Sequence, residues 1–136
     1  MTEIPDEPLT EREAQIMDEV WRLGEATAEQ VRAALPGDPH DSTVRTLLRV
    51  LVNKGFLKVE SQGKAYLYRA EVERRSAQRL AVGRLLSRFF GGSAESLVLR
   101  LIEDEQLTAE QLDELRRSNL ERAPSPKRRV RKGEKP

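Results

Sequence analysis

Residues 42–53 supply six side chains that donate hydrogen bonds, and their spacing places all six on one face of a helix. Arg45 and Arg49 are one helical turn apart, and each guanidinium can bind a guanine edge through two hydrogen bonds or clamp a phosphate. No carboxylate lies on this face, whereas a merely solvated face usually mixes acids with bases. We therefore predict that a DNA-contacting face is formed by Ser42, Thr43, Arg45, Thr46, Arg49 and Asn53.

Few residues are suited to other chemistry. The 136 residues include no cysteine and one histidine, His40, which excludes disulfides, cysteine-ligated zinc, iron–sulfur clusters and thiol catalysis. His40 has no second histidine to share a metal, and Glu103, Asp104 and Glu105 are consecutive rather than spaced as ligands in a loop. There is no glycine-rich phosphate loop. We predict no enzymatic activity, no catalytic residue, no metal site and no cofactor.

The hydrophobic pattern of residues 9–70 predicts three helices followed by a β-hairpin. Capping boxes, in which a threonine and an acid or amide three residues later satisfy the first backbone N–H groups, mark Thr10, Thr27 and Thr108 as helix starts. Asp41 or Ser42 is the expected cap of the third helix, 42–54. Its buried stripe has the helical spacing i, i+3, i+4, i+7, i+8 and consists of Val44, Leu47, Leu48, Leu51 and Val52.

The hairpin is predicted from two short strands, 56–60 and 65–69, around a turn that contains Gly63. Tyr66 and Tyr68 share one face because side chains alternate along a strand. A further strand at 25–26 is expected to pair with the hairpin edge. Three helices and a hairpin in this order form a winged helix-turn-helix, in which the third helix enters the major groove and the wing, 57–69, lies on the DNA backbone. The predicted wing contacts are Lys58, Lys64 and Arg69.

Residues 71–122 predict three more helices with too little apolar surface to fold alone. A second copy of the chain would cover their apolar stripe, which predicts a homodimer that reads two halves of a palindromic site. The alternative is that these helices fold back on their own winged helix. The expected interface residues are Leu85, Leu86, Phe89, Phe90, Leu97, Val98, Leu101, Ile102, Leu112 and Leu115.

The fold class is therefore mainly α with a small β-hairpin wing: an N-terminal winged helix-turn-helix, 9–70, and a C-terminal α-helical dimerization region, 71–122. A flexible acidic N-terminus, 1–8, and a disordered basic tail, 123–136, flank them. The net charge is only +1, but basic residues gather in 42–69 and in the tail, which favours a polyanionic partner. The tail either adds phosphate affinity or only solubilises the chain. No signal peptide or membrane span is predicted, so we expect a cytoplasmic protein.

These residues favour a dimeric protein that binds double-stranded DNA in a sequence-specific manner. Two other functions remain open: a winged helix that docks an acidic protein partner, and a protein that binds DNA without sequence specificity. An enzyme is disfavoured by the composition.

The chain resembles the penicillinase/methicillinase repressor family, bacterial transcriptional regulators of the BlaI/MecI/CopY type, from about residue 9 to 121. The motifs that carry the resemblance are Leu9-Thr10-x-x-Glu13-x-x-Ile16-Met17-x-x-x-Trp21, Ser42-Thr43-Val44-Arg45-Thr46-Leu47-Leu48-x-x-Leu51-x-x-Lys54-Gly55, Gly63-x-x-Tyr66-x-Tyr68 and Phe89-x-x-Gly92-Ser93-x-x-x-Leu97-Val98.

The resemblance implies a dimeric repressor on inverted repeats of the TACA/TGTA type, with contacts at Ser42, Thr43, Arg45, Thr46 and Arg49. In relatives, a membrane sensor protease that responds to β-lactam triggers cleavage between an Asn and a Phe in the dimerization region. The equivalent stretch here, 99–102, has Arg100-Leu101 in place of that pair. A copper-responsive branch of the family uses a C-terminal cysteine cluster, and this chain has no cysteine. The sequence leaves open whether a sensor protease or another inducing factor ends repression, and which genes are regulated.

Overall fold

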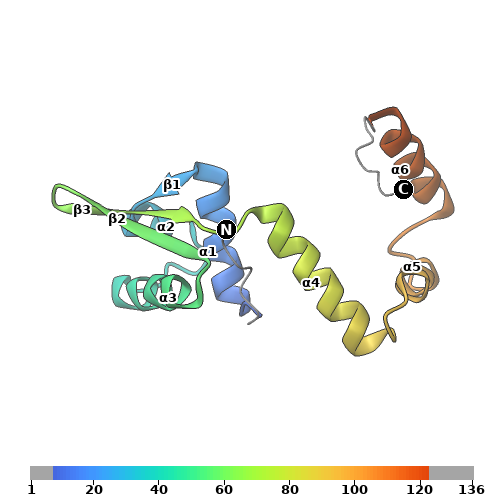
Figure 1. The fold of residues 1–136 in the computed structure, drawn as a ribbon, viewed down its shortest axis with the longest axis horizontal. Helices are drawn as coiled ribbons and strands as arrows, with labels where there is room; N and C mark the ends of the chain where they lie inside the picture. The colour runs from blue at the N-terminus through green and yellow to red at the C-terminus, as the bar shows by residue number, and fades with distance from the viewer. Residues whose placement is uncertain (1–7, 123–136) are drawn as a thin grey trace, which may run out of the picture. The chain divides into compact units, whose positions relative to one another are not determined.

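The computed structural model describes residues 8–122. The predicted acidic N-terminus, except for Pro8, and the predicted basic tail lie outside this range. The described part of the chain contains six helices and three short strands, which are labelled in Figure 1. In chain order they are α1 (Glu11–Leu23), β1 (Glu25–Ala26), α2 (Ala28–Ala34), α3 (Asp41–Lys54), β2 (Leu57–Gln62), β3 (Ala65–Ala70), α4 (Arg74–Phe89), α5 (Ala94–Glu103) and α6 (Ala109–Arg122).

The predicted capping boxes are confirmed. The Thr10 hydroxyl accepts from the Glu13 N–H at 3.1 Å, and the Thr10 N–H donates to the Glu13 carboxylate at 2.9 Å. Thr27 before α2 and Thr108 before α6 make the same reciprocal bonds with their amide partners. Each box satisfies orphan N–H groups at a helix start, which explains why these helices begin where the sequence predicts.

The third helix differs from expectation at its start. α3 begins at Asp41, one residue earlier than predicted, and its N-cap is His40, which makes no side-chain capping bond. The expectation of a cap at Asp41 or Ser42 is wrong because both residues are already helical. At the other end, Gly55 has φ of 90°, a left-handed conformation that glycine adopts readily. The Phe56 N–H bonds the Leu51 carbonyl at 3.0 Å and closes the helix end.

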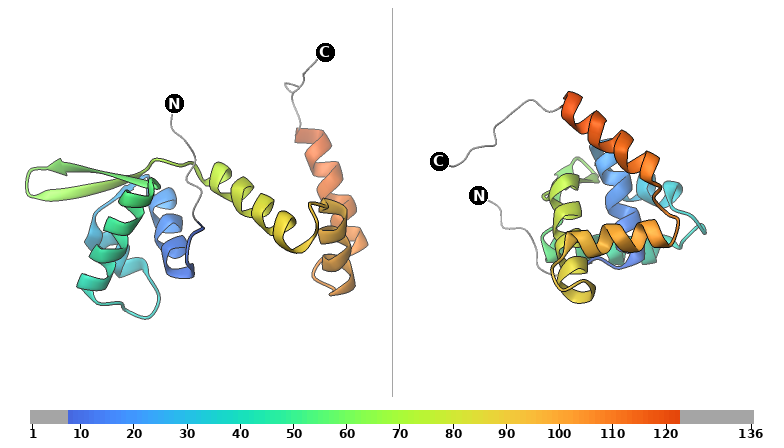
Figure 2. Two further views of the ribbon diagram at one scale, coloured as in Figure 1. Left: turned by 60° about the horizontal axis from the view of Figure 1, so that its bottom comes forward. Right: turned by 90° about the vertical axis from the view of Figure 1, so that its right-hand side faces the viewer.

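A three-stranded antiparallel sheet has the order β1-β3-β2. The predicted pairing of 25–26 with the hairpin edge is confirmed, since Glu25 lies opposite Arg69 on β3. In the hairpin, Lys58 lies opposite Arg69 and Val59 opposite Tyr68. Adjacent residues of a strand point to opposite faces, so these two cross-strand pairs lie on different sides of the sheet. The hairpin projects beyond α1–α3 (Figures 1 and 2).

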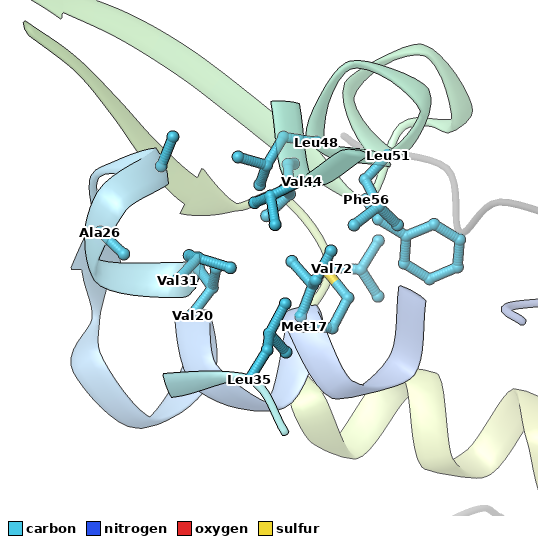
Figure 3. Packing of buried hydrophobic residues seen from close by; sticks show 13 residues of the cluster. Met17, Val20, Ala26, Val31, Leu35, Val44, Leu48, Leu51, Phe56 and Val72 are labelled. Atoms are coloured by element: carbon cyan, nitrogen blue, oxygen red, sulfur yellow. The ribbon is translucent and has the colours of Figure 1, made fainter. Parts of the chain in front are cut away.

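The hydrophobic core is built by α1–α3 and the base of the hairpin (Figure 3). The helices present apolar residues at helical spacing, and Phe56, in the turn after α3, and Leu57, the first residue of β2, add to them. Trp21 is half-buried against this core and donates to the Val72 carbonyl at 2.9 Å, which fixes the chain just before α4. The buried apolar residues are Ile16, Met17, Val20, Ala26, Ala28, Val31, Leu35, Val44, Leu48, Leu51, Phe56, Leu57 and Val72.

Backbone packing divides the chain into two units with a border between Arg84 and Leu85, inside α4. The first unit is a winged helix, so the predicted fold class is confirmed. In the second unit, Gly91 and Gly92 have positive φ between α4 and α5, and the Ser93 hydroxyl caps α5 by accepting from the Ser96 N–H at 3.1 Å. No helix among the described residues is long and apolar enough to cross a membrane.

Candidate nucleic-acid interface

The outer face of α3 is exposed along its whole length. All six donor residues predicted on it are exposed, while Val44, Leu48 and Leu51 on the opposite face are fully buried. The burial of one stripe therefore fixes which side chains α3 presents to solvent. The exposed donors are Ser42, Thr43, Arg45, Thr46, Arg49 and Asn53.

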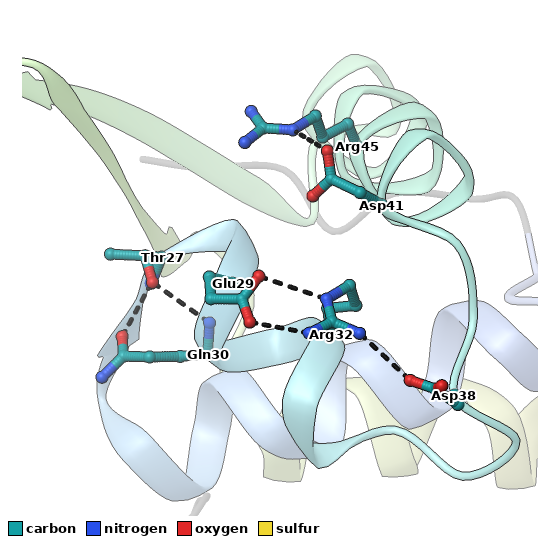
Figure 4. Close-up of polar contacts among 7 residues, drawn as sticks. All are labelled: Thr27, Glu29, Gln30, Arg32, Asp38, Asp41 and Arg45. Atoms are coloured by element: carbon teal, nitrogen blue, oxygen red, sulfur yellow. Dashed lines mark hydrogen bonds and ion pairs between the residues drawn. The ribbon is translucent and has the colours of Figure 1, made fainter.

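The two arginines on this face differ in their surroundings. Arg45 Nε donates to Asp41 Oδ2 at 2.8 Å across one helical turn, with both side chains about half exposed (Figure 4). The hydrogen bond and charge of Asp41 raise the pKa of Arg45 above its usual range. Arg49 makes no hydrogen bond or ion pair with any described side chain. The face thus holds one arginine that is oriented by a neighbour and one that is not.

A shallow groove of about 400 Å³ runs between α3 and the inner face of the wing. Arg45 and Arg49 line it from the helix, and valine and tyrosine side chains line the rest. Its two charged lining residues are both cations, which suits a polyanionic strand, and the apolar wall can pack against sugars or methyl groups. The remaining lining residues are Val52, Val59, Tyr66 and Tyr68.

Sequence reasoning did not include Tyr66 among the contact residues, although it is 57% exposed beside the two arginines. The signal was present in the alternation of the strand, which puts Tyr66, Tyr68 and Val59 on the same face. The sequence does not indicate that this face of the wing lies toward α3, where it lines the groove with the two arginines.

The predicted wing contacts are separated by the structure. Lys64 lies exposed at the turn of the hairpin. Lys58 and Arg69 lie on the sheet face opposite the groove and pair with acids. Lys58 is 4.0 Å from Glu71, and Arg69 Nη2 is 2.8 Å from Glu25 and 3.8 Å from Glu60. The structure therefore brings Arg45 and Arg49 together at the groove but leaves Lys58 and Arg69 on the other side of the wing.

A largely buried ion pair anchors the end of α3. Lys54 Nζ donates to Glu13 Oε1 at 2.8 Å, where the Glu13 side chain is 5% exposed. Burial by itself opposes ionisation of Glu13, but the hydrogen bonds from Lys54 and Thr10 outweigh it and lower the pKa of Glu13. The pair joins α3 to the start of α1 and holds the exposed face in place.

The loop before α3 is held in a similar way. Arg32 of α2 bonds Glu29 at 2.8 Å and reaches Asp38 at 3.1 Å (Figure 4). Arg12 of α1 donates to the Pro36 carbonyl at 2.9 Å. Glu29, with a smaller contribution from Asp38, raises the pKa of Arg32, and Arg32 lowers the pKa of Glu29. They fix the path by which the chain enters α3.

The single histidine stays close to the site but has a local partner. His40 Nδ1 lies 3.3 Å from the Ser42 hydroxyl. Among the described residues, no group of three His, Cys, Asp or Glu side chains is placed to hold a metal ion.

The residues predicted for a dimer contact are not buried within a single chain. Phe89 is 74% and Leu115 59% exposed. Leu85, Ile102 and Leu112 are also exposed, and the other five, Leu86, Phe90, Leu97, Val98 and Leu101, are half-buried. Their assignment to a subunit interface stays a prediction.

Comparison with known proteins places the chain among repressors. Residues 9–120 match the sequence profile described as penicillinase repressor. The penicillinase repressor of Bacillus licheniformis is 26% identical over 117 residues, covering 85% of this chain and 90% of that protein. The methicillin resistance regulatory protein MecI of Mammaliicoccus sciuri is 26% identical over 110 residues, covering 79% and 89%.

Among solved structures, the chain is similar to the solution structure of the DNA-binding domain of the repressor BlaI, with a TM-score of 0.48 and 22% identity. That match covers 56% of this chain and 93% of the BlaI domain.

Proposed function

Because the chain belongs to the penicillinase repressor family, we propose that it is a transcriptional repressor that binds operator DNA in a sequence-specific manner. The observation that carries the proposal is the exposed face of α3, where two arginines one turn apart border the groove beside the wing. In this proposal α3 enters the major groove, Arg45 and Arg49 contact base edges or phosphates, and the hydroxyls of α3 bond the backbone.

The wing lies on the DNA backbone in this proposal. Lys64 at its tip is exposed and reaches phosphate first, whereas Lys58 and Arg69 must leave their acidic neighbours to do so. Lys64 is therefore the wing residue with the lowest cost of rearrangement.

The protein acts as a homodimer in this proposal. A helix-turn-helix dimer contacts two half-sites about one helical turn, roughly 34–36 Å, apart. A two-fold symmetric protein reads an inverted repeat. The support for a dimer is the row of exposed apolar residues on α4–α6, which a second copy would cover.

The experiment begins with selection of fragments from the DNA of the source organism by the purified full chain at near-physiological salt. Recovery of a short inverted repeat supports the proposal. Recovery without any shared motif would favour a DNA-binding protein without sequence specificity. Failure to retain DNA would favour a module that docks an acidic protein.

Arg49→Ala tests the reading helix on the selected site. We expect binding to weaken by about 1–3 kcal/mol, because a bidentate base contact or a phosphate clamp is lost. Arg22→Ala is the matched control, since Arg22 is an exposed arginine on α1 that forms a local ion pair with Glu19. Equal affinities of the Arg49 variant and the parent, in a fluorescence anisotropy titration, would show that α3 is not the reading helix.

A further inference from the structure

Asp41 is the one acid within hydrogen-bond reach of the exposed α3 face among the described residues. Its carboxylate does not point into the protein but accepts from Arg45 Nε at 2.8 Å, and the side chain remains 50% exposed. Figure 4 shows the far end of the Arg45 guanidinium directed away from Asp41. The nearby acids Glu29 and Asp38 are both held by Arg32 instead.

This pairing leaves a defined part of Arg45 available. A guanidinium has five N–H donors in a planar fork, and Arg45 spends one of them, on Nε, on Asp41. Neither terminal nitrogen bonds a residue in the part of the chain that the structure describes, and the two form the edge that matches the two acceptors of guanine. The carboxylate also restricts the rotation of a side chain that otherwise loses considerable entropy when it is immobilised.

The same carboxylate changes the balance between the two ligands that an arginine on this helix can bind. A phosphate is an anion and is repelled by Asp41, so a contact between Arg45 and the backbone costs more than it would without the acid. A base edge carries no net charge and does not incur this penalty. Arg49, without such a neighbour among the described residues, has no corresponding bias.

We propose that Asp41 is a positioning residue for specificity: it holds Arg45 for contact with a base edge and disfavours its contact with phosphate. The proposal rests on the proposed function, because it requires that α3 reads DNA. It assigns discrimination between sequences chiefly to Arg45, whereas Arg49 can bind a base edge or a phosphate equally.

The test measures the dissociation constants of the full chain for its selected site and for an unrelated duplex of equal length, at one fixed salt concentration. The readout is the specificity ratio, which is the dissociation constant for the unrelated duplex divided by the dissociation constant for the selected site. For Asp41→Asn we expect this ratio to fall about two- to tenfold, mainly through tighter binding to the unrelated duplex, because Arg45 becomes free to clamp phosphate. Asp41→Glu retains an acid four residues before Arg45 and is expected to keep most of the ratio.

Two controls separate this role from a general effect of charge or of helix stability. Asp38→Asn removes one nearby negative charge without touching Arg45, and the amide oxygen of Asn can still accept from Arg32. We therefore expect the loop before α3 to keep its path and the ratio to stay within twofold of the parent. In an Arg45→Ala background, Asp41→Asn is expected to leave the ratio unchanged, because the side chain that Asp41 orients is gone. Thermal melts of each variant show whether α3 remains folded.

Three results would overturn the inference: a parental ratio in Asp41→Asn, the same fall in Asp38→Asn, or the same fall without Arg45. Each is compatible with a parent that still discriminates its site, so each leaves the proposed function standing. A parent that binds both duplexes equally would contradict the proposed function itself and would remove the basis of this inference with it.

Discussion

The winged helix and the helices that follow it differ in what covers their apolar side chains. Thirteen buried apolar residues lie between Ile16 and Val72, all within the first unit. None of residues 73–119 is buried, although α4–α6 carry leucines, valines and phenylalanines at helical spacing. The first region completes its own core from three helices and a hairpin. The second has an apolar face that its own residues leave uncovered, and we propose that a second copy of the chain covers it.

The strongest effect is expected from a charge placed among the exposed apolar residues of the second region. Phe89→Asp places a charge in the proposed subunit contact, and an unpaired buried charge costs about 3–5 kcal/mol. The mass measured by light scattering is expected to fall to that of one chain. Leu101→Asp is expected to act in the same way, whereas Ser87→Asp, on an exposed position of α4, is the matched control. Parental mass for both Phe89→Asp and Leu101→Asp would refute the proposed interface.

A substitution that creates a cavity in the core of the first region tests whether that core is formed by one chain alone. Leu48 is fully buried, and Leu48→Ala is expected to lower the free energy of unfolding by about 2–5 kcal/mol. Because the core belongs to one chain, this loss is expected at any protein concentration in urea titrations of the winged-helix transition. Val59→Ala, on the wing where Val59 is 41% exposed, should cost far less. A loss that depended on concentration would place Leu48 in a shared core.

The buried ion pair gives a smaller effect with a defined pH dependence. Lys54→Met leaves Glu13 without its partner and is expected to cost about 1–3 kcal/mol at neutral pH. The pKa of Glu13 is lower in the folded chain than its ordinary value of 4.5. Its contribution to stability is therefore complete above pH 4.5 and is lost as the pH falls through the folded pKa.

Urea titrations of the parent and of Lys54→Met should accordingly converge as the pH is lowered. Arg22→Met removes an exposed pair on the same helix and is the control, with an expected loss of at most about 1 kcal/mol. A difference between the parent and Lys54→Met that did not change with pH would show that Lys54 acts by packing rather than by charge.

The smallest effects are expected from substitutions at two matched helix caps, one in each region. Thr27 and Thr108 make nearly the same capping bonds, with hydroxyl distances of 3.1 and 3.0 Å. Thr27→Ala is expected to lower the global unfolding free energy by about 1 kcal/mol, because α2 belongs to the core.

Thr108→Ala should instead increase amide hydrogen exchange in α6 and leave the unfolding of the winged helix unchanged. Equal effects of both variants on global unfolding would show that the two regions form one cooperative unit.

The features that sequence predicted are those set by neighbouring residues. The capping boxes need only a hydroxyl and an acceptor three residues apart, and the presence of the hairpin follows from a glycine-containing turn between two short strands. The pairing of Lys54 with Glu13 joins residues 41 positions apart, and no local pattern indicates such a contact.

In the candidate site, too, the features set by neighbouring residues were predictable and the others were not. The exposed donors of α3 were predictable from the spacing of its buried stripe. The pairing of Arg45 was not, because a count that begins at Ser42 passes over Asp41, which is the first residue of the helix. The separation of Lys58 and Arg69 from the groove follows from strand alternation, but only once the sheet face that meets α3 is known.

The turn at Gly55 bears on the kinetics of DNA binding rather than on the stability of the fold. Two residues, Gly55 and Phe56, separate α3 from β2, and Phe56 and Leu57 enter the core immediately after the turn. This short connection restricts movement of the wing relative to α3. The two elements therefore present one preformed surface to DNA. Partners that bind without rearrangement associate at similar rates. In the proposed function, the sequences that this surface distinguishes then differ chiefly in residence time, and an operator is the DNA from which the protein dissociates most slowly.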